Sequence, residues 1–135
     1  MHSLRVVVAA DGEKLTAGTV YLAPAGLNLS LRNGHRVELL EPPATQFHVP
    51  GIDRTFTTVA QVCRDRSVGV LLTGMGSDGA QGLFAIRQAG GVTIAQDEET
   101  SAIFGMPRSA IELSAAQQVL PPAGIARCLN ALHVE

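Results

Sequence analysis

The stretch Ser67-Val-Gly-Val-Leu-Leu-Thr-Gly-Met-Gly-Ser-Asp-Gly-Ala80 joins an apolar run to a glycine-rich turn. Residues 68–72 are nearly all hydrophobic over the length of one strand, a pattern typical of a parallel strand covered on both faces. Gly74, Gly76 and Gly79 then mark a turn, and Asp78 stands where the next helix should start. Ligands and catalytic groups of open α/β sheets gather at this edge, so Asp78 is the first candidate for chemistry.

Downstream of this turn, strand patterns alternate with helix patterns. Alternation of this kind predicts parallel pairing through right-handed crossovers. Pro121 and Pro122 fit the first turn of the last helix, where proline is tolerated. The expected strands are 67–73, 91–96 and 117–120, and the expected helices are 79–89, about 107–113 and 122–132.

Upstream, two valine-rich strands are expected at 5–10 and 19–23. Asn33-Gly34 separates strand patterns at 28–32 and 35–40, which predicts an antiparallel hairpin with positive φ at both turn positions. A helix should begin at Ile52, because its apolar positions share one stripe. The whole pattern predicts an α/β fold: a doubly wound, mostly parallel sheet with helices on both faces and an antiparallel β-hairpin.

Composition excludes several classes of function. With 135 residues and 46% hydrophobic content the chain should form one domain. A net charge of -2, without a cluster of basic residues and aromatics, argues against a nucleic-acid partner. No apolar run approaches the roughly 20 residues of a membrane helix, and the first residues lack the apolar core of a signal peptide. We therefore expect a soluble cytoplasmic protein without membrane insertion.

Cysteines and histidines do not form a metal-ligand pattern. Cys63 and Cys128 each fall in a helical pattern without a second nearby ligand, which favours buried thiols over a disulfide or a metal site. The histidines are too scattered to share a metal ion. They are His2, His35, His48 and His133. No metal and no cofactor is expected.

The glycine turn also satisfies the dinucleotide fingerprint G-x-G-x-x-G. In that alternative a diphosphate lies on the helix N-terminus, and Asp97 or Glu98 accepts a hydrogen bond from a ribose hydroxyl. Asp78 argues against it, since a carboxylate inside the turn would repel the diphosphate. Asp78 could instead orient a histidine, or could simply cap its own helix for about 1 kcal/mol. Capping and orienting do not exclude each other.

Several motifs, taken together, resemble the bacterial chemotaxis receptor protein-glutamate methylesterases, that is, a CheB-type catalytic domain. The resemblance runs from about Asp11 to Leu120 with order and spacing preserved. The motifs are Asp11-Gly-Glu, Gly18-Thr-Val-Tyr-Leu-Ala-Pro24, Pro50-Gly-Ile-Asp53, Gly69-Val-Leu-Leu-Thr-Gly-Met-Gly-Ser-Asp-Gly-Ala80, Thr93-Ile-Ala-Gln-Asp97, Thr100-Ser and Phe104-Gly-Met-Pro-Arg108.

The resemblance implies a hydrolase that removes methyl esters from receptor glutamates and deamidates certain receptor glutamines with a serine, a histidine and an aspartate. Asp78 matches the triad aspartate, which accepts a hydrogen bond from the histidine ring. Met75 matches the active-site methionine, whose backbone N–H could point at the oxyanion; Gly74 and Gly76 shape the same turn. The implied partners are methyl-accepting chemotaxis receptors.

The family's serine and histidine precede the segment that resembles Ser3 to Gly12. We therefore expect an incomplete, carboxyl-terminal part of one methylesterase domain at 1–135, lacking the first strands and a receiver domain. Ser77, Ser101 and His48 are poor substitutes: Ser77 adjoins Asp78, Ser101 lies on a distant loop, and His48 falls in a surface segment. Gly51 replaces the family's usual serine, which should weaken the cap of the helix at Ile52.

Two consequences follow for the chain by itself. It should hydrolyse no ester quickly. It should also self-associate into a homo-oligomer through an exposed sheet edge, because the missing strands would leave that edge unpaired. A docking module that binds receptor tails without catalysis is the non-enzymatic alternative, beside the dinucleotide-binding domain.

Overall fold

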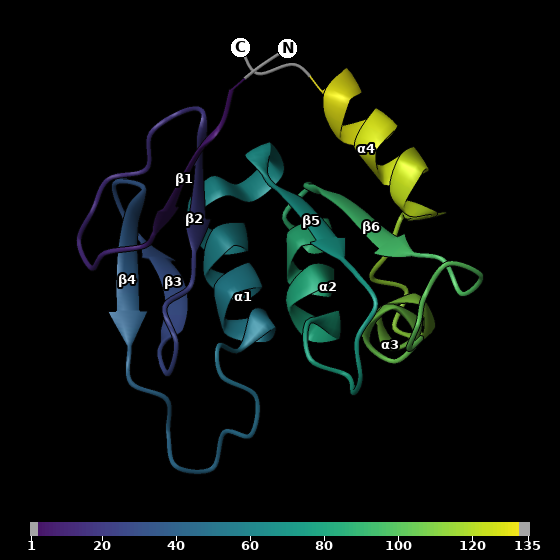
Figure 1. Ribbon diagram of the computed structural model, residues 1–135, viewed down its shortest axis with the longest axis horizontal. Coiled ribbons are helices and arrows are strands. Elements are labelled where there is room, and N and C mark those ends of the chain that lie inside the picture. The colour runs from purple at the N-terminus through teal and green to yellow at the C-terminus, as the bar shows by residue number, and fades with distance from the viewer. Residues whose placement is uncertain (1–2, 133–135) are drawn as a thin grey trace.

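Strand β5 (Val68–Leu71), the apolar run of the sequence, lies at one edge of a three-stranded parallel sheet. The computed structural model describes residues 3–132 (Figure 1). The central strand is β6 (Val92–Gln96) and the far edge is β7 (Gln118–Leu120), so the order is β5-β6-β7. The parallel pairing expected from the alternation is confirmed.

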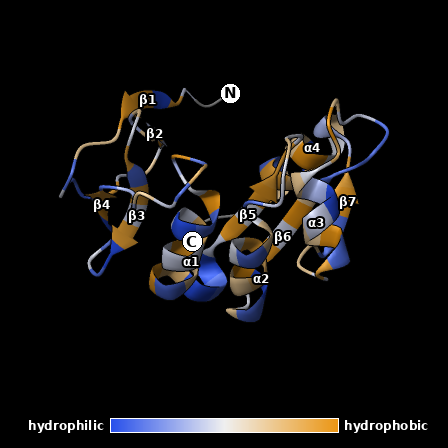
Figure 2. Ribbon diagram, turned by 90° about the horizontal axis from the view of Figure 1, so that it is seen from below, coloured by the Kyte–Doolittle hydropathy of each residue, from blue (hydrophilic) through white to orange (hydrophobic). Residues whose placement is uncertain are grey.

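Helices cover both sides of this sheet. Helix α2 (Ala80–Gln88) connects β5 to β6, and α3 (Met106–Glu112) connects β6 to β7. Figure 2 shows α2 on one side of the strands and α4 (Pro122–Ala131) on the other. None of the helices within residues 3–132 has the length and apolarity to cross a membrane.

The first half of the chain forms two small sheets. Strand β1 (Arg5–Val8) pairs in parallel with β2 (Thr19–Leu22). Strands β3 (Asn28–Arg32) and β4 (Arg36–Leu40) form the expected antiparallel hairpin. Helix α1 (Ile52–Cys63), followed by a short 3-10 turn at Arg64–Arg66, packs against β3 on one side and α2 on the other.

The hairpin turn differs from the sequence prediction by one residue. Arg32 pairs with Arg36, so the loop has three residues rather than two. Positive φ occurs at Gly34 (83°) and His35 (56°), whereas we predicted it at Asn33 and Gly34. Histidine tolerates this left-handed conformation better than most residues, and β4 consequently begins at Arg36.

The main core lies between β5 and the helices on its covered face. Its fully buried members are small or aliphatic, and the partly buried Ile52 and Phe56 bring α1 into contact with it. Burial of this apolar surface is the main stabilising contribution. The buried residues are Leu71, Ala80, Leu83, Ala110 and Ala115.

The β1–β2 pair is apolar but poorly covered. Leu4, Val6 and Val8 alternate along the chain and so share one face, and each is about 60% exposed. Val6 pairs with Val20 and Val8 with Leu22, and both partners are also exposed. The predicted uncovered apolar surface is confirmed. It consists of one face of the β1–β2 pair and is not limited to a strand edge.

Candidate functional site

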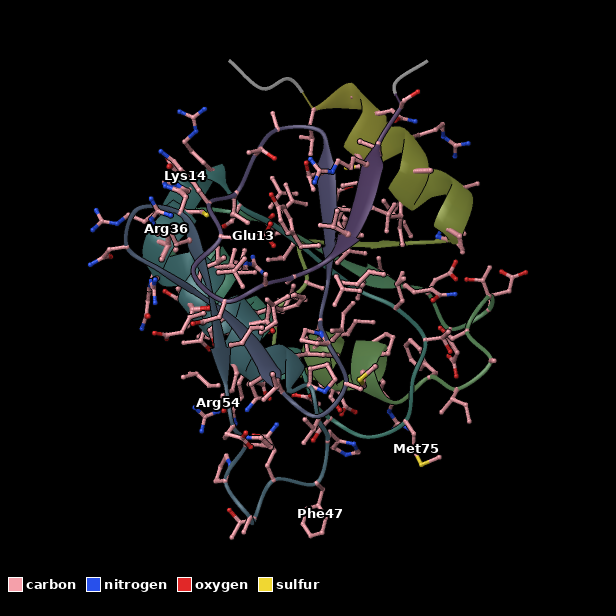
Figure 3. The ribbon with its side chains drawn as sticks, turned by 60° about the vertical axis from the view of Figure 1, so that its left-hand side comes forward. Glu13, Lys14, Arg36, Phe47, Arg54 and Met75 are labelled. Atoms are coloured by element: carbon pink, nitrogen blue, oxygen red, sulfur yellow. The ribbon has the colours of Figure 1, made fainter. Side chains whose placement is uncertain are left out.

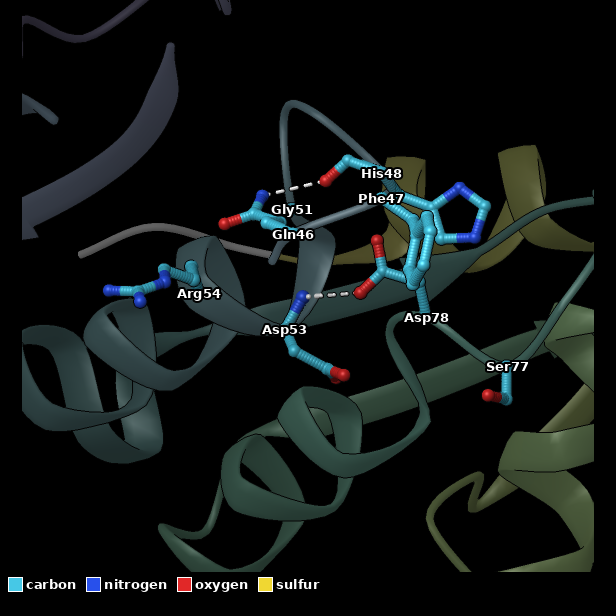
Figure 4. A pocket seen from close by; sticks show the side chains of 8 residues that line it. All are labelled: Gln46, Phe47, His48, Gly51, Asp53, Arg54, Ser77 and Asp78. Carbon is cyan, nitrogen blue, oxygen red and sulfur yellow. Dashed lines mark hydrogen bonds between the residues drawn. The ribbon is translucent and has the colours of Figure 1, made fainter. Parts of the chain in front are cut away.

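The N-termini of α1 and α2 lie side by side next to the glycine turn. Each N-terminus is capped by an aspartate that belongs to the start of the other helix. Asp78, two residues before α2, accepts hydrogen bonds from the backbone N–H groups of Ile52 and Asp53 in α1. Asp53 in turn accepts from the backbone N–H groups of Gly79 and Gly82. Figure 4 shows the Asp78 carboxylate pointing to the Asp53 backbone nitrogen, while the Asp53 side chain points away towards the neighbouring helix.

Asp78 is half-buried, and both of its oxygens are used. Oδ2 lies 2.9 Å from the Ile52 nitrogen and Oδ1 lies 3.1 Å from the Asp53 nitrogen. The helix N-terminus favours the negative charge placed there. A carboxylate offers about four lone-pair sites, so each oxygen retains one for a further donor. Asp78 is therefore fixed in place and still able to accept from an imidazole.

The capping role predicted for Asp78 concerned the wrong helix. We expected it to cap the helix that follows it, but the N-cap residue of α2 is Gly79, and α2 has no side-chain cap from its own N-cap residue. Asp78 instead caps α1, which its neighbour Gly51 cannot cap. The weak cap predicted from Gly51 is thus compensated from residue 78.

Asp53 is the site residue that the sequence analysis missed as a functional group. Its Oδ1 lies 2.7 Å from the Gly82 nitrogen and 3.1 Å from the Gly79 nitrogen. Burial raises its pKa above the usual value; the Gly82 and Gly79 N–H groups oppose this shift, and the charge of Asp78 adds to it. The available signal was the Ile52-Asp53 pair at a helix start, which places a carboxylate in the first turn.

The glycine turn is held by the loop that precedes α3. Gly74 donates to the Ile103 carbonyl at 3.0 Å, and the Gly74 carbonyl accepts from Gly105 and Met106. A Cβ on Gly74 would meet the Met106 methyl group, so a larger residue at this position would push the flexible Met106 side chain aside. Gly76, at φ 91°, then reverses the chain. The motif Phe104-Gly-Met-Pro therefore positions the turn.

Met75 projects from this turn into solvent. Its side chain is 74% exposed, and its backbone N–H donates to no residue within 3–132. Phe47, 97% exposed, projects at the same end of the molecule (Figure 3). The Met75 N–H is thus available to a ligand, as an oxyanion donor must be.

Two adjoining hollows open at Asp78. One, of about 330 Å³, lies on the Asp53 and Arg54 side, and the other, of about 410 Å³, lies on the Met75 and Met106 side. Phe47 and His48 line both hollows. Asp78 therefore borders open space and is not enclosed among aliphatic side chains.

The residues weighed as substitutes do not assemble a triad with Asp78. His48 and Ser77 line the first hollow with Asp78, but no hydrogen bond joins any two of these side chains. The hydroxyl of Ser101 donates to the Asp97 carbonyl on another loop. Within residues 3–132 the chain provides the aspartate without a bonded histidine or serine.

The contacts at the start of α2 argue against the dinucleotide-binding alternative. The N–H groups of Gly79 and Gly82 at the start of α2, where a diphosphate would bind, already donate to the Asp53 carboxylate. Asp97, one of the two residues predicted as ribose acceptor, instead accepts from the backbone and hydroxyl of Thr100 in a local turn. The helix start that would hold the diphosphate is therefore already occupied by a carboxylate of the chain itself.

Cysteines and histidines show no metal site in the part of the chain that the structure describes. Both cysteines are free thiols, and both are half-buried, whereas we predicted buried thiols. Burial still raises the pKa of the Cys63 thiol. His2 and His133 lie outside the described residues, and among the others no cluster could hold a metal ion.

Comparisons with known proteins confirm the resemblance seen in the motifs. Residues 1–129 match the CheB methylesterase family model. A protein-glutamate methylesterase/protein-glutamine glutaminase of Paramagnetospirillum magneticum is 50% identical over 129 residues, covering 96% of this chain and 36% of that protein. The protein-glutamate methylesterase FrzG of Myxococcus xanthus is 45% identical over 127 residues, covering 94% of this chain and 38% of that protein.

The fold matches as well. The crystal structure of the Thermotoga maritima CheB methylesterase catalytic domain superposes with a TM-score of 0.84 at 38% identity. That match covers 90% of this chain and 66% of the solved chain. The chain spans about a third of the length of the curated relatives it matches.

Proposed function

The chain belongs to the CheB methylesterase family, and we propose that it supplies the triad aspartate, Asp78, to a protein-glutamate methylesterase. The main reaction is hydrolysis of a methyl ester on a receptor glutamate. The second reaction is deamidation of receptor glutamines. The substrate is a methyl-accepting chemotaxis receptor, and the location is the cytoplasm. The resemblance implies that the serine and the histidine of such a triad come before the segment that resembles Ser3 to Gly12.

The geometry of Asp78 is the observation that supports this role best. Two backbone N–H groups hold the carboxylate at 2.9 and 3.1 Å, and the residue borders two hollows. A triad aspartate needs both properties: a fixed orientation and an oxygen free for an imidazole N–H. A carboxylate that served only as a cap would not need to border open space.

In the proposed reaction each group of this chain has one task. Asp78 accepts from the histidine ring, fixes its tautomer and stabilises the imidazolium that forms when histidine takes the serine proton. The Met75 N–H donates to the oxyanion of the tetrahedral intermediate. The ester C–O bond then breaks, methanol leaves with the proton from histidine, and water hydrolyses the acyl-enzyme.

A chimera tests the role of Asp78 in an active enzyme. Residues 1–129 of this chain replace the matched segment of the Paramagnetospirillum magneticum relative, and methanol release from a methylated receptor is measured. Asp78→Asn should lower kcat by about 10⁴-fold, because the histidine tautomer is then wrong. The matched control is Asp97→Asn, whose side chain holds only a local turn and should change kcat less than about threefold.

Two results would refute the proposal. An active chimera that tolerates Asp78→Asn would show that the carboxylate is no part of the triad. Turnover by this chain alone, with labelling by a serine reagent, would show that it contains its own nucleophile. A chimera that binds the receptor without hydrolysing it would favour the docking module.

A further inference from the structure

We propose that Asp53 is the positioning residue for Asp78: it holds the start of α2 against α1 and so keeps the Asp78 carboxylate in its catalytic orientation. This inference rests on the proposed role of Asp78 as the triad aspartate. It adds a second carboxylate, at the edge of the same hollow, whose effect on the reaction passes through the first.

The two aspartates close a ring of hydrogen bonds. The backbone N–H of Asp53 donates to the Asp78 side chain, and the backbone N–H of Gly79, the residue after Asp78, donates to the Asp53 side chain. Asp53 is thus tied to the Asp78 segment through both its main chain and its side chain, whereas Asp78 is tied to α1 through its side chain and through the N–H of the next residue. Asp78 cannot shift relative to α1 unless a bond on each side of the ring is lost.

Close packing of the two helices lets the short Asp53 side chain reach α2. A Cβ on Gly82 would lie 2.6 Å from the Phe56 Cβ and 3.0 Å from the Asp53 Cα, far inside normal contact distance. The absence of a side chain at residue 82 allows its N–H to donate to Asp53 at 2.7 Å. Lengthening residue 53 by one methylene would therefore displace its carboxylate.

The negative charges of Asp53 and Asp78 are balanced by backbone groups. Two negative side chains lie next to each other, and within residues 3–132 neither has a cationic partner. Their charges are balanced by four backbone N–H donors and by two helix N-termini. Loss of Asp53 would remove the one oxygen that accepts two of these four hydrogen bonds.

Positioning predicts a loss in the rate of the chemical step. A displacement of about 1 Å can cost about 10²-fold in rate. In the chimera, Asp53→Ala should lower kcat by about 10²-fold with KM within twofold. Asp53→Asn retains an oxygen acceptor and should stay within about fivefold of the parent. Asp53→Glu, which keeps the charge but moves the oxygens, should fall between the two and serves in place of Asp53→Ala where that variant does not fold.

Hydrogen exchange on this chain tests the coupling without any activity. Asp53→Ala should speed exchange at the backbone N–H groups of Ile52 and residue 53, which donate to Asp78, as well as at Gly79 and Gly82. Asp53→Asn should leave the first two protected. Thr57→Ala, an exposed change in the same helix, is the matched control and should alter none of them.

The two experiments separate the two ideas. If Asp78→Asn leaves the chimera active, the proposed function fails, while faster exchange at Ile52 still supports the coupling. If Ile52 and residue 53 stay protected in Asp53→Ala, or if the loss is in KM rather than kcat, the positioning role of Asp53 is refuted whatever Asp78 does.

Discussion

At the scale of single residues, Asp53 should make the stability of the fold depend on pH. Its pKa is raised from the usual 3.8, so the folded state holds the proton more tightly than the unfolded state. The stability that this proton contributes is complete below 3.8 and is lost as pH rises through the folded pKa. In urea unfolding between pH 3 and 7, wild-type stability relative to Asp53→Asn should fall as pH increases.

The same experiment has a clear contrary outcome. If the difference between the wild type and Asp53→Asn were constant or grew with pH, the Asp53 carboxyl would not be held in a desolvated position beside Asp78. Asp97→Asn is the control for loss of a surface carboxylate, since Asp97 bonds only within its own turn.

The sequence located Asp78 correctly but could not identify its hydrogen-bond partners. A glycine turn after an apolar strand places residue 78 at the edge of the sheet, and the structure places it there. The donors that hold it are Ile52 and Asp53, more than twenty residues earlier in the chain. Local capping rules consider only the following helix, so they do not predict a cap exchanged between two helices.

At the scale of elements, the contact between α1 and α2 depends on one small residue. Gly82→Ala would place a methyl group against the Phe56 Cβ and the Asp53 backbone, and backbone atoms cannot swing aside as a flexible side chain can. Overpacking of this kind costs about 1–3 kcal/mol, more than the helix propensity gained by replacing glycine. The unfolding free energy measured with urea should fall by the difference between the two, up to about 2 kcal/mol.

A neighbouring position provides the control. Gln81→Ala lies on the same turn of α2 but is exposed, so it should change the unfolding free energy by less than about 0.5 kcal/mol. A Gly82→Ala variant as stable as the wild type would show that the two helices can move apart at no cost and that Asp53 is not held closely against α2.

Elements were predictable where their patterns were local. The helices at Ile52 and Pro122 and the alternating strands appear within one to three residues of expectation. The hairpin turn was misplaced because Asn-Gly favours a two-residue loop, whereas the observed register pairs Arg32 with Arg36. That register matches the adjoining bridge between Lys14 and Arg36, which involves a segment distant in sequence.

At the scale of the whole molecule, one face of the β1–β2 pair is not covered by other parts of the structure. The fold match extends over 66% of the solved catalytic domain. Parallel strands are normally buried on both faces, and the valine-rich sequence of β1 suits such burial. Instead, one continuous face formed by both strands remains exposed. An uncovered apolar face with free strand edges is an association site.

The chain on its own should therefore self-associate. Light scattering should give a mass above that of one chain, increasing with concentration, and a dye that binds apolar surface should fluoresce. Val8→Lys with Leu22→Lys places two charges at one cross-strand pair of the exposed face, so both signals should drop while circular dichroism is unchanged. Glu98→Lys with Glu99→Lys adds two lysines on the exposed loop after β6 and is the control. If the wild-type chain stays monomeric and the dye does not fluoresce, the exposed face of β1 and β2 must be covered in solution by the chain itself.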